Sequence, residues 1–387
     1  RGAQSHRQDR NLAARHRWSC ALTAVVGVQT ERLKRHKENR LLERSFTVDV
    51  LKVVAAQFIV WHHFSAYGPM SDTMGLMWPN LINWLYEDAR LAVQVFLVVG
   101  GYLAGQSVIS KPVNHPFVLI AKRYLRLVPF YLFALTLITL AVAASHKSIQ
   151  SDWLPTPPTW LQFLSHGLLV NDLFGFEALS SGAWYIAIDF QLYVMLIGLC
   201  HVLQNHNPKR LSVGIAVLCI ASMWQFNRVK ELDIWAIYFF AAYGLGILAA
   251  WAKRSAFDTA IFCITALLAV AALWFEFRSR LCLALITATW LVIKPKGMVH
   301  WTPMKRVVHR LSNSAYVLFL THFGIIVLFS SMWNQSHFYD PSMAFALTAF
   351  AWLCCVGMGL FMHEKIEVPM HHWVSQKSKQ LLLRLTH

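Results

Sequence analysis

Runs of about 20 apolar residues recur along most of the chain, and this repeat limits the fold more than any other feature. Hydrophobic residues make up 56% of the chain and charged residues only 14%, so a water-soluble fold would expose wide apolar patches. Lipid is therefore the expected solvent for most side chains. The cysteines lie mostly inside the apolar runs, where a free Cys behaves as a small buried hydrophobe, so neither a disulfide framework nor a metal site is expected.

The apolar runs predict an all-α, polytopic membrane helix bundle of about ten transmembrane helices. Each run is bounded by charge, Pro or Gly, and the run that begins at residue 280 is the shortest. The predicted spans are residues 47–67, 91–109, 118–144, 184–203, 211–227, 233–251, 256–275, 280–294, 312–332 and 343–363.

Three regions follow from these spans. Residues 1–44 form a basic tail whose one apolar run, Cys20–Val28, is too short to cross a bilayer. The chain begins at Arg1 and no Met precedes Met70, so we expect this tail to be disordered or to be translated upstream sequence. Residues 45–370 are predicted to form the membrane domain, and residues 371–387 a cytoplasmic tail.

Positive charge predicts the orientation of the bundle. The formal net charge is +16, but no polar module interleaves basic residues with exposed aromatics, so nucleic-acid binding is not expected. With both termini inside, the cytoplasmic connections hold Lys111, Lys122, Arg123, Lys209, Arg210, Lys253, Arg254, Lys294, Lys296, Lys305, Arg306 and Arg310. The opposite side holds Arg90, Lys147, Arg228, Lys230, Arg278 and Arg280. This asymmetry is typical of the positive-inside rule.

The longest connection, residues 145–183, falls on the predicted outer side and is rich in Trp and Pro. A connection of this length is more often functional than not, so it could cover a site for a substrate on that face. A second interpretation is that its Trp and Pro residues rest at the lipid headgroups.

Ionisable residues inside the first span are the strongest indication of a site, because a charge at the bilayer centre costs about 2.5 to 3.5 kcal/mol. They are Asp49, Lys52, His62 and His63. Asp49 and Lys52 share a helical face, and Lys52 and His63 point the same way about 16 Å apart. Imidazole suits proton abstraction from an alcohol near neutral pH. The alternative is that the charged pair reaches one surface and the histidines the other headgroup layer.

The third span opens with Arg123 and Arg126, which are three residues apart and share a face. Guanidinium pairs suit phosphate groups, and a nucleotide-bearing donor could meet them from the cytoplasm. The alternative is a simple cluster that stops and orients the span.

Later spans add more polar residues. Asp189 in the fourth span should face the bundle and find a partner, because an unpaired carboxylate would be expensive in lipid. His322 in the ninth span is expected to be a buried, hydrogen-bonded histidine. Glu364 and Glu367 lie where the last span leaves the membrane, where they could form a solvated helix end.

These residues resemble the transmembrane acyltransferase-3 family, the membrane-bound O-acyltransferases of bacterial glycans, from about Phe46 to Pro369. The first span is similar to the family pattern of Asp, Arg and His, with Lys52 in place of Arg and His63 on the motif histidine. The third span matches the family's Arg-x-x-Arg pair with Arg123 and Arg126.

Other segments carry the resemblance with substitutions. Gln94 stands where the family commonly has Asp, and the segment from Trp184 has Asp189 in place of Glu. Leu311 to His322 is similar to the family's Ser-Tyr-x-Leu-Tyr-Leu-x-His segment, and Glu367-Val-Pro to its terminal Glu-x-Pro.

The resemblance implies transfer of an acyl group from a cytoplasmic acyl-CoA, usually acetyl-CoA, to a glycan hydroxyl on the outer face of a bacterial inner membrane. His63 would act as general base or transient acyl carrier, and Asp49 would orient and polarise the site. Lys52 would stabilise donor charge, and Arg123 with Arg126 would hold the CoA phosphates. Other candidate site residues are His62, Gln94, Trp184, Asp189, His322 and Glu367.

Two other functions stay open. A transporter or exporter would also use intramembrane charges, although no pair of related halves is visible in the chain. An inactive family member acting as a partner protein would be compatible with the substitutions at Lys52, Gln94 and Asp189. The sequence fixes neither the acceptor, nor the acyl group, nor the oligomeric state.

Overall fold

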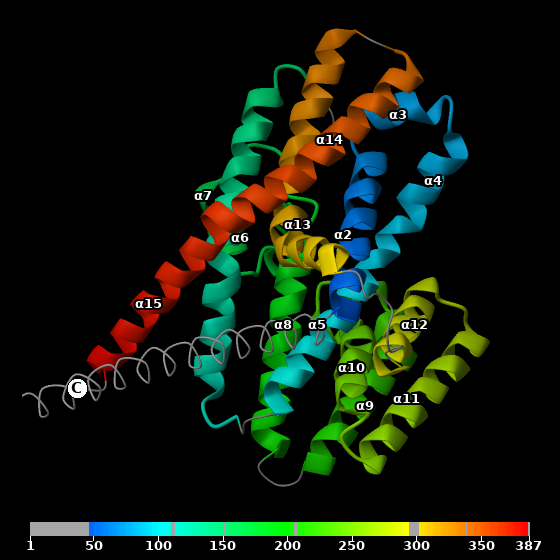
Figure 1. The fold of residues 1–387 in the computed structure, drawn as a ribbon, viewed down its shortest axis with the longest axis vertical. Helices are drawn as coiled ribbons and strands as arrows, with labels where there is room; N and C mark the ends of the chain where they lie inside the picture. Colours follow the sequence, from blue (N-terminus) through cyan, green and yellow to red (C-terminus); the bar gives the residue numbers. More distant parts are fainter. Residues whose placement is uncertain are drawn as a thin grey trace, which may run out of the picture.

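The structure, a computed structural model, describes residues 46–109, 113–149, 152–204, 208–293, 302–337 and 339–385. These residues form helices and no strand, so the predicted all-α fold is confirmed for them (Figure 1). The predicted basic tail of residues 1–44 lies outside the described residues, as do the predicted loop cations Lys111, Lys294 and Lys296.

Each of the ten predicted spans coincides with a helix. The helices are α2 (Phe46–Ala66), α5 (Ala92–Ile109), α6 (Pro116–Ser145), α8 (Ala183–Leu199), α9 (Pro208–Trp224), α10 (Ala236–Trp251), α11 (Ala256–Phe275), α12 (Ser279–Ile293), α13 (Thr302–Ser336) and α14 (Pro341–Met362). Among the described residues, 6 helical segments are long and apolar enough to cross a membrane, and α10 and α12 are shorter apolar helices. The chain therefore fits an integral membrane protein, whereas the predicted count of about ten crossings is not confirmed.

The apolar runs did not predict several elements. These are α3 (Pro69–Gly75), α4 (Pro79–Glu87), α7 (Trp160–Gly167) and α15 (Val368–Leu385), π-helical turns η3 (Cys200–Gln204) and η6 (His363–Glu367), and 3-10 turns η1 (Ala89–Leu91), η2 (Asp172–Phe174), η4 (Phe226–Arg228) and η5 (Lys230–Leu232). Through η6, α14 continues into α15, which carries residues predicted as a tail (Figure 1). Most of these elements are too short to give a membrane-length apolar signal.

The helices divide into two neighbouring groups (Figure 1). In the first group, α10 packs against α9, α11 and α12. In the second group, α13 packs against α2, α6 and α14. Helix α5 contacts both α10 and α2 and so joins the groups. The polar residues of the first predicted span lie on α2, which contacts α5 and α13, and those of the third lie on α6, which contacts α8 and α13.

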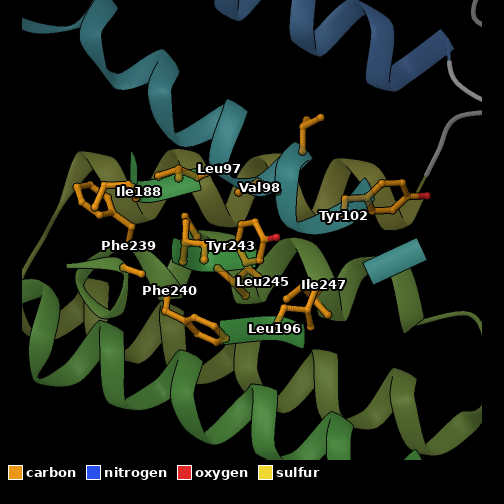
Figure 2. Close-up of a cluster of buried hydrophobic side chains, with 14 of the residues drawn as sticks. Leu97, Val98, Tyr102, Ile188, Leu196, Phe239, Phe240, Tyr243, Leu245 and Ile247 are labelled. Atoms are coloured by element: carbon orange, nitrogen blue, oxygen red, sulfur yellow. The ribbon is translucent and has the colours of Figure 1, made fainter. Parts of the chain in front are cut away.

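Two glycines allow α5 and α10 to cross at close range. A Cβ atom added to Gly101 would lie 2.0 Å from the carbonyl oxygen of Tyr243, and one added to Gly246 would lie 2.0 Å from the carbonyl oxygen of Val98. Leu97 and Val98 from α5 interdigitate there with Tyr243, Leu245 and Ile247 from α10 (Figure 2). Small residues at a helix crossing are a common basis for helix association in lipid, where the hydrophobic effect between helices is weak.

We expect Gly246→Ala to destabilise the protein by about 1 to 3 kcal/mol, because the added methyl group collides with backbone that cannot yield without moving α5. Thermal unfolding in detergent measures the loss. Gly198→Ala on α8 is the matched control, because a Cβ atom there meets nothing within 4 Å. An equal loss in both variants would contradict the role of the close crossing.

Candidate active site

Two cavities, each of about 420 Å³, lie between the helices. The first, here called the histidine cavity, is lined by Ile59, His62, His63, Arg90, Leu91, Val93, Gln94, Asp172, Ser181, Trp184, Asp233, Ile234, Phe239, Arg280 and Phe319. The second, the arginine cavity, is lined by Lys52, Phe96, Val99, Gly100, Leu103, Arg123, Arg126, Leu127, Tyr185, Ile186, Asp189, Asn313, Ala315, Tyr316, Phe319, His363, Glu367, Val368, His371 and His372. Phe319 lines both cavities.

A buried pair of imidazoles, His63 and His322, lies beside the histidine cavity, and His63 lines it. His63 near the end of α2 is 7% exposed, and His322 in the middle of α13 is fully buried. The Nδ1 atom of His63 lies 2.6 Å from Nε2 of His322, and the two rings are nearly parallel, with planes 5° apart. His322 therefore has the hydrogen-bonded, buried position expected from the sequence, and its partner is the motif histidine.

The hydrogen bonds of this pair assign the protons. Nδ1 of His322 lies 3.0 Å from the carbonyl oxygen of Leu318, which can only accept, so this Nδ1 carries a proton. In the neutral ring Nε2 then has a lone pair and accepts a hydrogen bond from Nδ1–H of His63. The same rule gives Nε2 of His63 a lone pair. A neighbouring group that fixes the tautomer of an imidazole base is a recurring catalytic arrangement.

Other predicted residues surround the pair. The ring of His62 lies 5.0 Å from that of His63, and its Nδ1 donates to the carbonyl oxygen of Leu85 over 3.3 Å. Gln94 and Trp184, both predicted as site residues, line the same cavity. Gln94 is only 8% exposed and so presents a buried amide to the cavity.

The long connection before α8 contributes to the histidine cavity. Asp172 and Ser181 line it, and the hydroxyl oxygen of Ser181 lies 3.4 Å from Nδ1 of His63. Burial raises the pKa of the Asp172 carboxyl above its ordinary value, and the negative charge of Asp233 raises it further. Trp160 of the same connection is exposed. The connection therefore contributes to the wall of the histidine cavity at one end and exposes an aromatic side chain elsewhere.

The arginine cavity contains an ion pair between Arg123 and Asp189. The sequence predicted a partner for Asp189 but did not identify it. Nη2 of Arg123 on α6 lies 2.5 Å from a carboxylate oxygen of Asp189 on α8, and the guanidinium also lies over the ring of Tyr193. Asp189 thus has the partner that its position in lipid requires. Arg126, one turn further along α6, is exposed and lines the cavity.

Lys52 and His63 line different cavities, although the sequence places them on one face of α2. Nζ of Lys52 donates to the carbonyl oxygen of Ser312 over 2.7 Å. Asp49 lines neither cavity. Its carboxylate accepts from the hydroxyl of Ser312 at 2.6 Å and lies 3.0 Å from Nδ1 of His309, so Asp49 ties the start of α2 to α13.

The two glutamates after α14 have different surroundings. Glu364 pairs with Arg310 at 2.9 Å on an exposed surface. Glu367 lines the arginine cavity, and a carboxylate oxygen lies 2.9 Å from Nδ1 of His363. Only Glu364 thus matches the solvated helix end that the sequence allowed for both.

A sequence model of a protein family described as "Acyltransferase domain", of the acyltransferase-3 type, matches residues 46–361. The chain belongs to the acyltransferase-3 family. The apolar helices among the described residues fit an integral membrane protein of this family. Most of the motif residues that carried the resemblance thus line one of the two cavities, whereas Asp49 and His322 line neither.

The chain is also similar to a curated protein, the "Regulator of hypoxia-inducible factor 1" of Caenorhabditis elegans, with 26% identity over 210 residues. The match covers 49% of this chain and 41% of that relative, so the chain spans less than half the length of the relative it matches. No solved structure matches this acyltransferase-3 chain.

Sequence reasoning missed the histidine-cavity residues Ser181, Asp233 and Arg280, and Phe319 between the cavities. Asp233 and Arg280 lie in connections at helix ends, where charged residues are ordinary. Ser181 and Phe319 are common residue types in their segments. A single sequence contains no pattern that distinguishes these four residues from other residues of the same types nearby.

We expect Asp189→Ala to destabilise the protein by about 3 to 5 kcal/mol, because Arg123 would keep a largely buried charge without its partner. The double variant Arg123→Leu with Asp189→Leu should recover part of the loss. Thermal unfolding in detergent tests both. The exposed pair Arg228 and Glu276 is the control, where Glu276→Gln should leave the unfolding temperature close to the parental value. A double variant no better than Asp189→Ala would exclude the paired-charge explanation.

Proposed function

We propose that this acyltransferase moves an acyl group from acyl-CoA, most simply acetyl-CoA, to a hydroxyl group of a glycan. The observation that carries the proposal is the His63–His322 hydrogen bond, which leaves a lone pair on Nε2 of a histidine that lines a cavity. A positioned imidazole of this kind is the usual general base for an alcohol.

In the proposed reaction, Nε2 of His63 takes the proton from the acceptor hydroxyl as the oxygen attacks the thioester carbonyl. The new C–O ester bond forms, the C–S bond breaks, and the electron pair leaves with the CoA sulfur. The imidazolium of His63 then returns the proton to the thiolate, so the products are an ester and free CoA-SH. His322 accepts the Nδ1–H hydrogen bond of His63 throughout and holds the ring in place.

The arginine cavity has the chemistry for the donor. Arg126 is exposed there, and Lys52, His371 and His372 add further nitrogen groups to its wall. Guanidinium and ammonium groups suit the phosphates of CoA. Because Asp189 already pairs with Arg123, we propose that Arg126 is the main phosphate ligand and that Arg123 mainly shapes the cavity.

The histidine cavity would hold the acceptor. Its wall carries Arg90, Asp172, Asp233 and Arg280, which lie at helix ends and connections predicted to face outward. We propose that the arginine cavity faces the cytoplasm and the histidine cavity the opposite side. The bacterial inner membrane, the cytoplasmic termini and an exported or cell-envelope polysaccharide acceptor stay predictions of the sequence analysis.

We expect His63→Ala to lower acyl transfer by about 10² to 10⁴-fold without removing the protein from the membrane, because the general base is lost. Membranes that contain the variant are incubated with labelled acetyl-CoA, and label in the glycan fraction is counted. His201→Ala is the control, because this exposed histidine lines neither cavity, and its transfer should equal that of the parental protein. Transfer at near the parental rate in His63→Ala would rule out His63 as the base. Solute transport by the parental protein in vesicles without consumption of acyl-CoA would instead favour a transporter.

We expect His322→Leu to lower kcat by about 10²-fold or more with little change in the KM for acyl-CoA, because Nδ1 of His63 loses its acceptor. His322→Gln, whose amide oxygen can accept the same hydrogen bond, should restore part of kcat. Steady-state kinetics on purified protein separate the two parameters. A rise in KM at constant kcat, or no difference between Leu and Gln, would show that His322 does not position the base.

A further inference from the structure

Three aromatic side chains from three helices meet between the cavities. They are Phe96 on α5, Tyr185 on α8 and Phe319 on α13, here called the aromatic partition. The ring centroids are 6.1 Å apart for Phe96 and Tyr185, 6.1 Å for Phe96 and Phe319, and 5.3 Å for Tyr185 and Phe319. Each ring therefore contacts the other two, two of the pairs edge to face, which is a favourable arrangement for aromatic pairs.

The partition lies at the boundary of the two cavities. All three rings line the arginine cavity, and Phe319 lines the histidine cavity as well. Next to the partition in sequence, Gln94 and Trp184 line the histidine cavity. On α5, Gln94 lines the histidine cavity and Phe96, two residues later, lines the arginine cavity. On α8, Trp184 and Tyr185 line the two cavities in the same order.

Phe319 fits closely into this boundary. It is 6% exposed, and a Cβ atom added to Gly182 would lie 2.8 Å from its ring. Its ring centroid lies 6.2 Å from that of His322, the residue that orients His63. A glycine at position 182 therefore leaves the space that the ring occupies beside the imidazole pair.

We propose that the aromatic partition separates the donor from His63 and sets the size of the acyl group that can cross, with Phe319 as the determining residue. The inference rests on the proposed function. With the CoA phosphates in the arginine cavity, the thioester carbonyl must still come within about 3 to 3.5 Å of the acceptor oxygen in the histidine cavity. The ring that the cavities share stands on that route, so a short acyl group passes its edge and a long one collides with it.

The first experiment measures acyl-chain preference. Membranes that contain the parental protein, Phe319→Ala or Phe319→Leu are supplied with labelled acetyl-, butanoyl- or hexanoyl-CoA, and label in the glycan fraction is counted. The ratio of hexanoyl to acetyl transfer should rise about 10-fold or more in Phe319→Ala and less in Phe319→Leu, because the space released accepts extra methylenes.

Phe323→Ala is the matched control. Phe323 is also buried on α13, one turn away, but it lines neither cavity and packs against Tyr67 and Trp153. Its chain preference should equal that of the parental protein. An unchanged ratio in both Phe319 variants, or the same rise in Phe323→Ala, would overturn the assignment of Phe319.

The second experiment tests the partition without any acyl transfer. Ser181→Cys places a thiol in the histidine cavity, and a small membrane-impermeant methanethiosulfonate is added to one face of oriented vesicles, with the parental chain giving the background from its own cysteines. The thiol should react from the face that carries Asp172 and Arg280. Reaction from the face that carries His371 should require Phe319→Ala.

The two failures are distinguishable. No transfer by the parental protein with any acyl-CoA would contradict the proposed function, while the labelling result would still report on the partition. Acetyl transfer by the parental protein together with equal labelling of Ser181→Cys from both faces would leave the function intact and overturn the partition.

Discussion

A polar seam between α2 and α13 supports the rest of the site. At one end Ser312 contacts both Asp49 and Lys52, and near the other end His63 contacts His322. Buried polar groups cost free energy unless they are hydrogen-bonded, so these contacts fix the register of the two helices. The same register places His63 and Phe319 on the wall of one cavity.

Pairings between helices, in this seam and elsewhere, explain why ionisable residues are tolerated inside the bundle. Asp189 has Arg123, Asp49 has Ser312 and His309, and Lys52 has a backbone carbonyl. Each pairing joins residues that are far apart in the chain, and so each joins two different helices. The two cavities lie between the helices with the aromatic partition at their boundary, an arrangement that is compatible with the proposed transfer between two faces of a membrane.

The sequence predicted the helices well because their cause is local. A run of about 20 apolar residues and its bounding charges fix a segment's place in lipid without reference to any other segment. Apolar runs alone did not determine the number of membrane crossings, because α10 and α12 are short for helices that cross a bilayer. The short α3, α4 and α7 were missed for the related reason that they carry no long apolar run.

The sequence also pointed to His63, Arg123 and Asp189 as candidate site residues, because the cost of charge in lipid makes such residues conspicuous one at a time. It did not assign them to two cavities. Helical periodicity placed Lys52 and His63 on one face of α2. The two residues line different cavities because the helices packed against one end of this face differ from those packed against the other end.

By itself, then, the sequence determined a helical membrane protein with ionisable groups at defined depths, because hydropathy and charge act residue by residue. Only the tertiary structure decided that His322 orients His63, that Arg123 is held by Asp189, and that Phe319 stands between the cavities. Those contacts join residues 66 or more positions apart, and the packing of helices, which no single segment encodes, brings them together.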